Sequence, residues 1–398
     1  MRKVFHVFLG RADDSREQFL TEAGLPATPY ELRDALDAVR ESESETPYME
    51  YLGEGGWQSL RLKMEALTDL PSLYALNALA GKMALMNGRE RRAFTGLVLM
   101  ERRDAGGRIS IPRLYDLACA TDVCHVIEAF GDADVGRFFV ENGFFSELSG
   151  LPEAALERLD YEKIGRERRE AAGGVLLTEE YAYAERDGDI PERFKDLDLT
   201  PKEPDYAVLL EAGGGENGVL LKLPAAPETL AAMGMETAFR CLDCRIPALR
   251  DAIEKAGSVA EVNQAARFLE AVPEERLGTY KALLSVKGFG TLRDALNLYK
   301  ETDGYALNAA IRSPDAAARR EIRSLLSEAD AERILPYVDL SGLGKRIMAE
   351  RGQILTKYGA FCRKDGEPLL EQPRTPEPER GGAAGKSPKS KKRNAPSR

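Results

Sequence analysis

The sequence predicts an α+β protein in which short antiparallel strands and amphipathic helices recur in the same order along the chain. Short runs such as residues 3–9 alternate apolar and polar side chains, as a strand with one buried face does. Longer runs such as residues 72–100 carry apolar side chains at helical spacing. Short segments of the first half also reappear, in order, in the second half.

The first predicted helix has clear signals at its start. It is expected within residues 25–40, where Thr28 is a good N-cap and Pro29 suits the first helical position. Glu31 completes a capping box with Thr28. Residues 41–60 then hold five glutamates and no basic side chain, a pattern that fits either a solvated loop or a functional acidic patch.

Residues 72–100 and 110–130 are predicted to be helical, and the stretch 135–183 follows them. It begins as an amphipathic helix with phenylalanines on its apolar face, and Asn142-Gly143 end that helix because both residues tolerate a left-handed backbone. A second helix is expected from Pro152 onward. The segment 175–183 alternates like an edge strand.

The pattern restarts at residue 206, where a hairpin and the start of a helix are expected. Five segments of the second half match earlier segments in register and in the same order. The pairs are residues 25–32 with 223–230, 72–83 with 258–269, 114–116 with 292–294, 159–166 with 338–345, and 175–183 with 353–361. The sequence therefore predicts two units, residues 1–203 and residues 204–362, followed by a tail, residues 363–398.

The net charge of −10 is unevenly distributed over these parts. Unit one carries 26 basic and 39 acidic side chains, a net charge of −13, whereas unit two carries 20 and 22, a net charge of −2. The tail carries 10 and 5, a net charge of +5, and is rich in Pro, Gly, Ser and Lys. This composition predicts a disordered basic tail, which either contacts nucleic-acid phosphates weakly or only keeps the chain soluble.

Several other classes of protein are not indicated. The chain has no run of about 18 apolar residues and no signal peptide, so a cytoplasmic protein without membrane contact is expected. Buried thiols are a better interpretation of Cys241 and Cys244 than a zinc site, which needs four ligands. Residues 213–218 match GxGxxG, but a strand follows them where a dinucleotide site needs a helix.

Catalysis is not indicated either. The histidines His6 and His125 lie in apolar surroundings without a serine or cysteine pattern beside them, and no paired carboxylate motif that would collect Mg²⁺ occurs. No combination of nucleophile, base and oxyanion donor is visible. The chain is therefore expected not to be an enzyme and to need no cofactor and no metal.

Several short motifs occur in an order and spacing that resemble one known family. VGRFFVE (135–141) is followed by LP (151–152), by LDYxxxGR (159–166) and by a strand that ends in an aromatic residue, and IPRLYDLA (111–118) precedes them. Together they resemble the C-terminal half of the ArdA antirestriction proteins, so the chain looks like two ArdA-like units in tandem, the second one divergent. The resemblance implies an elongated protein of small sheet-and-helix modules. It also implies a DNA mimic that binds type I restriction–modification enzymes and protects incoming mobile DNA.

The acidic side chains of residues 132–162 are the candidate partner-binding residues. B-form DNA presents one negative charge per about 1.7 Å of its axis, so an elongated protein with carboxylates at similar spacing can occupy a groove built for DNA. No specific DNA binding by the protein itself is expected. The acids that the resemblance carries over are Asp132, Asp134, Glu141, Glu153, Glu157, Asp160 and Glu162. The alternative for each is an ordinary exposed helix residue.

Departures from the family keep a second function open. Family members are single-unit and more acidic, whereas this chain is doubled and its segment 132–169 holds six basic side chains. Unit two is predicted to replace the second subunit of the family dimer within one chain, with a homodimer as the alternative. The alternative function is a non-catalytic scaffold of a mobile element that binds a different partner. Carboxylates clustered along one long face favour mimicry, and evenly mixed charges favour the scaffold.

Overall fold

A computed structural model describes residues 2–10, 21–40, 47–54, 67–105, 108–148, 150, 152–213, 218–233 and 238–369. The first glutamates of the acidic stretch 41–60, the hairpin turn at Asn217 and the predicted tail from residue 370 onward lie outside these ranges. Within the described residues the fold is α+β, with four three-stranded antiparallel sheets and helices packed against them.

The first sheet has the strand order β2-β1-β3, and the strand predicted at residues 3–9 is confirmed as β1. The strands are β1 (Phe5–Gly10), β2 (Thr21–Leu25) and β3 (Tyr48–Glu54). α1 (Pro29–Asp37) follows β2 and begins with the predicted capping box. The Glu31 amide donates to Thr28 Oγ1 at 3.3 Å, and the Thr28 amide donates to Glu31 Oε2 at 3.1 Å.

Three helices share their hydrophobic core with this sheet: α2 (Leu70–Ala84), α3 (Gly88–Ala105) and α4 (Ile111–Cys119). The predicted helical stretch 72–100 is two helices, because Asn87 and Glu90 exchange side-chain-to-amide bonds of 2.8 and 3.0 Å that start α3. The prediction of helix as far as residue 130 is wrong at Cys124–Glu128, which form β4.

The second sheet has the order β4-β6-β5, with β5 (Val175–Leu177) and β6 (Ala182–Arg186) beside β4. The prediction of one edge strand over 175–183 is wrong, because Tyr181, with φ of +50°, turns the chain back as a hairpin. Three helices lie between β4 and β5 in the chain: α5 (Asp132–Glu141), α6 (Glu153–Leu156) and α7 (Tyr161–Ala172). The predicted end of α5 at Asn142 and Gly143 is confirmed. The single helix expected from Pro152 is instead two, because Asp160 caps a new one.

The second half of the chain repeats these elements, including the predicted hairpin and helix after residue 206. Its strands are β7 (Val208–Ala212), β8 (Val219–Leu223), β9 (Phe239–Cys244), β10 (Tyr305–Asn308), β11 (Ile354–Thr356) and β12 (Gly359–Arg363). Its helices are α8 (Pro227–Met233), α9 (Arg250–Glu254), α10 (Val259–Ala271), α11 (Glu274–Lys287), α12 (Leu292–Leu298), α13 (Pro314–Leu325), α14 (Glu328–Ile334) and α15 (Leu340–Glu350). Short 3₁₀ helices lie at Thr121–Val123, Ser146–Leu148, Phe194–Asp196, Pro247–Leu249, Tyr299–Gly304 and Leu335–Tyr337.

The two halves agree in details that the sequence matches anticipate. Their sheets have the orders β2-β1-β3 and β8-β7-β9, then β4-β6-β5 and β10-β12-β11. The Asn77 side chain bonds the amide and carbonyl of Ala27, and the Asn263 side chain makes the same pair of bonds to Ala225. These bonds tie the start of the first helix of each half to the helix that follows.

The halves meet through α1, whose first turn lies against β9. Asp243, which is 1% exposed, accepts hydrogen bonds from Thr28 Oγ1 at 2.6 Å, Tyr206 Oη at 2.9 Å and, at 3.4 Å, the Tyr30 amide. A carboxylate from unit two therefore supplements the N-terminal cap of a helix in unit one. Arg250 adds an ion pair to Glu31 at 2.5 Å.

The other end of α1 is held by the C-terminal part of unit two. Asp34 pairs with Lys281 at 2.9 Å and Lys357 at 2.8 Å, and Tyr358 Oη donates to it at 3.0 Å. Burial alone would raise the pKa of Asp34, but the two lysine charges outweigh burial and lower it. Arg312 donates to the carbonyl oxygens at the end of the helix, including Asp37 O at 2.7 Å.

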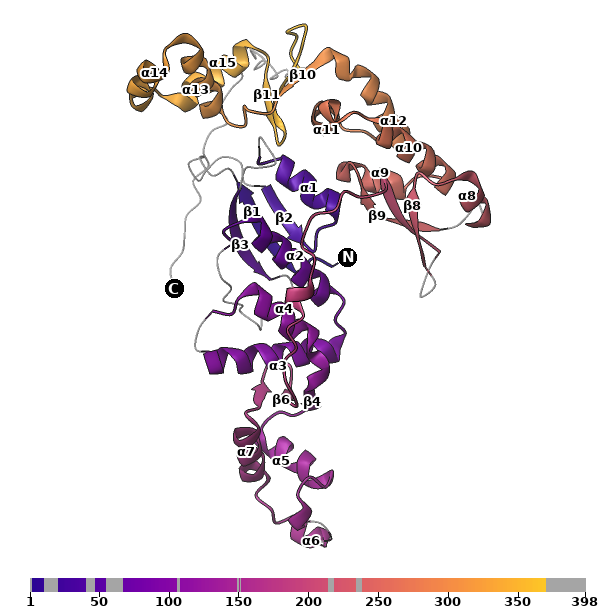
Figure 1. Ribbon diagram of the computed structural model, residues 1–398, viewed down its shortest axis with the longest axis vertical. Helices are drawn as coiled ribbons and strands as arrows, with labels where there is room; N and C mark the ends of the chain where they lie inside the picture. Colours follow the sequence, from indigo (N-terminus) through magenta and orange to yellow (C-terminus); the bar gives the residue numbers. More distant parts are fainter. Residues whose placement is uncertain are drawn as a thin grey trace, which may run out of the picture.

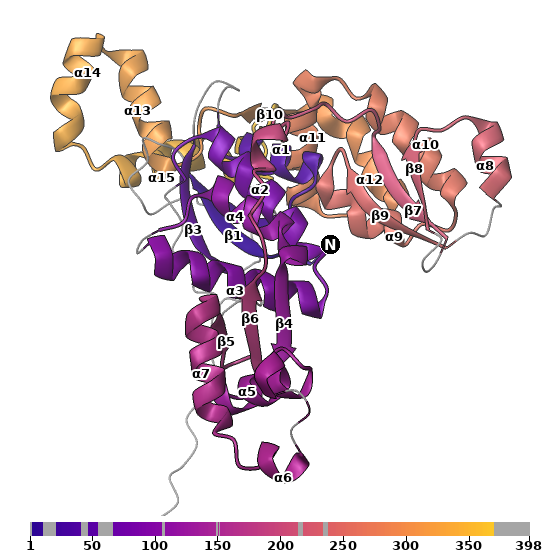
Figure 2. The ribbon, with the colours of Figure 1, turned by 60° about the horizontal axis from the view of Figure 1, so that its bottom comes forward.

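The molecule is elongated along unit one (Figure 1). α5, α6 and α7 form its lower end, and unit two arches over α1 at the upper end. Figure 2, turned by 60°, shows the same separation of α6 from the helices of unit two. None of the described helices is both long enough and apolar enough to cross a lipid bilayer.

Candidate functional site

The lower end of the molecule is built on a close crossing of α5 and α7. A Cβ atom at Gly165 would lie 1.8 Å from the Asp132 carbonyl oxygen, and one at Gly136 would lie 2.0 Å from the Tyr161 carbonyl oxygen. Only glycine permits this backbone contact. Asp132 of α5 and Arg169 of α7 then join the two helices through two hydrogen bonds of 2.8 and 2.9 Å. The backbones of the two helices are therefore fixed relative to one another.

Three of the seven predicted acids make bonds that hold this framework together. The bonds to Arg169, more than any other cause, hold the pKa of the Asp132 carboxyl below its ordinary value. Asp134 Oδ2 accepts from the Phe130 amide at 2.8 Å, and Asp160 Oδ1 caps α7 by accepting from the Lys163 amide at 3.0 Å.

The other four predicted acids are exposed and make no ion pair or hydrogen bond to the described part of the chain. Glu141 ends α5, Glu153 opens α6, Glu157 is the C-cap of α6, and Glu162 lies in the first turn of α7. We call these four residues the acidic tip. Figure 1 places their helices at the end of the molecule farthest from unit two.

Basic side chains lie among the acids of the tip. Arg137 is exposed and stacks over the Tyr161 ring at 5.5 Å, and Lys163 pairs with Glu167 at 3.9 Å. Arg158 and Arg166 are exposed as well. The surface is therefore mixed in charge, and the four acidic-tip carboxylates alone do not make it uniformly negative.

A cavity of about 650 Å³ lies between the second sheet and α5, lined by Phe138, Phe139 and Phe144. At its wall, Glu185 accepts from Arg168 at 2.7 Å and from Tyr183 Oη at 2.8 Å. Sequence reasoning missed this network, although residues 183 and 185 point to the same face of a strand. These three side chains are paired with each other, although Arg168 Nε is buried without a hydrogen-bond partner in the described part of the chain.

The rim of this cavity holds His125, whose Nε2 lies 3.0 Å from Asp187 Oδ2. Both side chains are exposed. None of the described lining residues is a serine, threonine or cysteine that this pair would activate. Among the residues that the structure describes, no three His, Cys, Asp or Glu side chains gather as a metal site.

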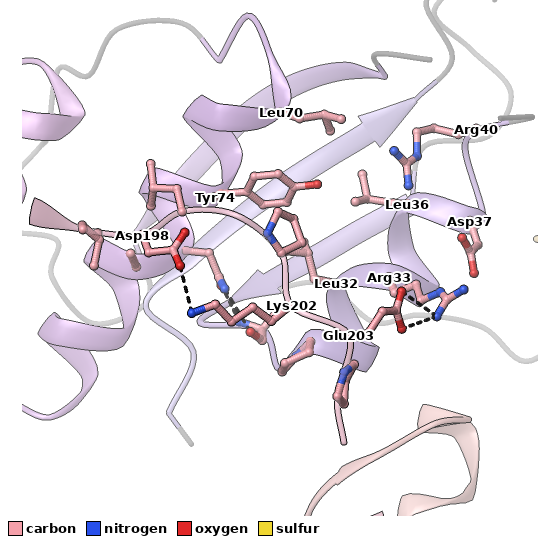
Figure 3. A pocket seen from close by; sticks show the side chains of 18 residues that line it. Leu32, Arg33, Leu36, Asp37, Arg40, Leu70, Tyr74, Asp198, Lys202 and Glu203 are labelled. Atoms are coloured by element: carbon pink, nitrogen blue, oxygen red, sulfur yellow. Dashed lines mark hydrogen bonds and ion pairs between the residues drawn. The ribbon is translucent and has the colours of Figure 1, made fainter. Parts of the chain in front are cut away.

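A second cavity of about 490 Å³ lies between α1, α2 and the connection 197–204 (Figure 3). Leu36 and Tyr74 line it. Arg33 of α1 pairs with Glu203 of the connection at 3.0 Å, and Lys202 pairs with Asp198 within the connection at 2.8 Å. The first pair holds the connection against α1, and each of these four charged groups has a partner.

The CxxC pair of unit two is packed as part of the core. Cys241 and Cys244 are buried in the core of unit two. Burial raises the pKa of the Cys241 thiol to about 12 and that of the Cys244 thiol further still, so neither is a thiolate at neutral pH.

No protein family, characterised protein or solved structure matches the chain in sequence or fold. The resemblance to the ArdA family therefore rests on the motifs of residues 111–183 and their repetition in unit two.

Proposed function

We propose that this protein is a non-catalytic DNA mimic that occupies the DNA-binding groove of a type I restriction–modification enzyme. The observation that carries the proposal is the acidic tip at the end of an elongated molecule: four exposed carboxylates without a partner among the described residues, two of which, Glu141 and Glu162, stand on the crossed helices α5 and α7. The ArdA-like motifs surround these residues in the sequence.

The physical basis is charge complementarity. A groove that binds DNA is lined with lysine and arginine, and exposed carboxylates attract those side chains over a range of about 10 Å at moderate salt. Glu141 and Glu162 stand on helices whose backbones are fixed to one another, so less backbone freedom is lost on binding than for a flexible acidic peptide. Because the tip has only four such carboxylates, the rest of unit one, with its net charge of −13, has to contribute to steering.

A scaffold of a mobile element with a different partner is the second candidate. The exposed side chains of Arg137, Arg158 and Arg166 favour it, because they place positive charge beside the acidic tip. Unit two supports either function as an intramolecular partner, since it holds both ends of α1.

A displacement assay tests the proposal. The full chain is added to a type I methyltransferase bound to a labelled duplex, and release of DNA is followed at about 50 mM and about 200 mM salt. The decisive variant combines Glu141→Gln, Glu153→Gln, Glu157→Gln and Glu162→Gln. Its matched control combines Glu254→Gln, Glu270→Gln, Glu275→Gln and Glu350→Gln, four exposed acids of unit two with the same change in net charge.

Mimicry predicts that the wild type releases DNA, that high salt weakens release, and that the tip variant loses more activity than the control. Equal losses in the two variants would mean that net charge acts without the tip. No release by the wild type from several type I enzymes would favour the scaffold.

A further inference from the structure

The second sheet of each half has a face that is occupied in unit two and, within the described part of the chain, exposed in unit one. In unit two, Arg312 and two residues of the hairpin turn, Lys357 and Tyr358, form hydrogen bonds to α1. Arg312 is buried, and its guanidinium donates to the carbonyl oxygens at the end of that helix. This face is therefore a helix-binding surface with a known occupant.

The register of the sheets identifies the same face in unit one. Tyr183 pairs with Leu176 and Ile127, as Phe361 pairs with Ile354 and Leu307. The turns 178–181 and 356–359 are therefore equivalent. Counting along them, Glu179 takes the place of Lys357 and Tyr181 the place of Gly359.

The position in unit one that corresponds to Arg312 is found from the helix that follows the first strand of the second sheet, β4 in unit one and β10 in unit two. Arg312 directly precedes Ser313, the N-cap of α13, and Phe130 directly precedes Gly131, the N-cap of α5. An arginine that binds a helix end in unit two is thus replaced in unit one by an aromatic residue.

In unit one this face displays two large rings to solvent. Phe130 is 77% exposed and Tyr181 is 59% exposed, with their ring centroids 4.9 Å apart. Both are held at the backbone, since Asp134 binds the Phe130 amide at 2.8 Å and the Tyr181 carbonyl accepts from the Ala129 amide at 3.0 Å. Tyr181 also has φ of +50°, a conformation that costs free energy for a residue with a side chain. An exposed aromatic pair fixed at the expense of backbone strain is typical of a binding surface.

The charge of the face is inverted between the halves. Glu179 stands where unit two has Lys357, and Glu128, at the end of β4, is exposed beside Phe130 in the chain. We call Phe130, Tyr181, Glu128 and Glu179 the aromatic face. Because the face of unit two binds the acidic α1 through cations, the aromatic face suits an occupant that carries cations.

We propose that the aromatic face is a second contact with the target enzyme, which places a lysine- or arginine-bearing protein surface over the two rings. This inference rests on the proposed function and assigns a separate task to a separate surface. A guanidinium or ammonium over an aromatic ring is attracted by its negative face, and the two glutamates add ion pairs at the edge. The acidic tip then steers association, and the aromatic face slows dissociation.

The displacement assay separates the two tasks when it is run with Phe130→Ala and Tyr181→Gly. The second substitution installs the glycine found at the equivalent position of unit two, so it removes the ring without straining the backbone. Tyr337→Ala removes an 89% exposed ring from unit two and serves as the matched control. Thermal unfolding followed by circular dichroism confirms that each variant is folded.

The expected result is that Tyr181→Gly and Phe130→Ala each raise the concentration needed for DNA release at least about tenfold at both salt concentrations, with the salt dependence unchanged. Tyr337→Ala leaves release unchanged. Wild-type activity with no loss in Tyr181→Gly would overturn the aromatic contact while leaving mimicry intact, and an inactive wild type would overturn both. If the wild type self-associates in sedimentation and Tyr181→Gly does not, the occupant is a second copy of the chain, which also overturns the inference.

Discussion

The C-terminal parts of the two halves share one framework but differ in what their surfaces do. In unit one, α5 and α7 cross at Gly165 and are closed by the Asp132–Arg169 ion pair. In unit two, α13 and α15 cross at Gly344, and the place of Arg169 is taken by Met348, which packs with Ile311 and Ala317. The backbone contact is thus common to both halves, while the side chains around it have become polar in one and apolar in the other.

The same contrast holds for their outer faces. In unit two, cationic side chains of this face bind α1. The equivalent face of unit one is exposed and aromatic. Duplication therefore provides an internal comparison: a feature shared by both halves belongs to the framework, and a feature present in only one half is a candidate for function. The following predictions test that distinction.

The largest effect is expected where unit two holds α1. Lys281→Met leaves the Asp34 carboxylate buried with Lys357 as its remaining lysine partner, which should lower the free energy of unfolding by about 3–5 kcal/mol. Urea unfolding followed by circular dichroism measures it. Lys287→Met, on the same helix, removes an exposed pair with Glu301 and a contact with the Tyr305 ring, and should cost about 1 kcal/mol. Similar costs for both variants would mean that the buried cluster does not join the halves.

A second prediction concerns the shared helix crossing. Gly165→Ala and Gly344→Ala each place a Cβ atom within 2 Å of a backbone oxygen (1.8 and 1.7 Å), so both should lower the free energy of unfolding by about 3 kcal/mol. Gly81→Ala is the control, because nothing lies within 4 Å of its new methyl group and alanine favours a helix. It should raise stability by about 0.5–1 kcal/mol. A large cost for only one of the crossings would mean that they are not equivalent.

The contact between the halves should also respond to pH with two opposing signs. The pKa of Asp34 is lowered, so its contribution to stability is present above the unfolded-state pKa of about 3.9 and is lost as the pH falls through the folded value. Burial raises the pKa of Asp243 in spite of its hydrogen bonds, so its contribution is lost as the pH rises through the folded value. Urea unfolding from pH 3 to 7 checks this.

The two substitutions to asparagine distinguish these contributions. Asp34→Asn should flatten the loss of stability toward low pH, and Asp243→Asn should remove a loss toward higher pH. If both variants change the pH dependence in the same direction, the assignment of opposite shifts is wrong.

The sequence predicted the elements whose signals are local. The capping box at Thr28, the end of α5 at Gly143 and the hairpin before α8 depend only on neighbouring residues. All three predictions are confirmed in the described residues. The turn at Tyr181 was missed because a tyrosine with positive φ has no local signal.

Contacts between the halves were beyond sequence reasoning for a different reason. Asp34 and Tyr358 are separated by 324 residues, and nothing near either indicates the other. The repetition did predict which positions are equivalent. The aromatic face is identified by comparing equivalent positions of the two halves in the structure. The candidate acids were identified by resemblance, and the structure then separated the three that make framework bonds from the four that make no bond to the described part of the chain.

The smallest effect distinguishes a framework bond from a binding contact at one residue. Asp160 and Asp339 occupy equivalent positions and cap α7 and α15, so Asp160→Ala and Asp339→Ala should each lower stability by about 1 kcal/mol. Asp160→Asn keeps the cap, because asparagine caps as well as aspartate, but removes the charge. Its stability should match the wild type. If it also releases DNA from the methyltransferase as the wild type does, the side chain of Asp160 serves the helix alone. If release weakens at unchanged stability, Asp160 belongs with the acidic tip, and the comparison of caps between the halves then isolates its electrostatic contribution to binding.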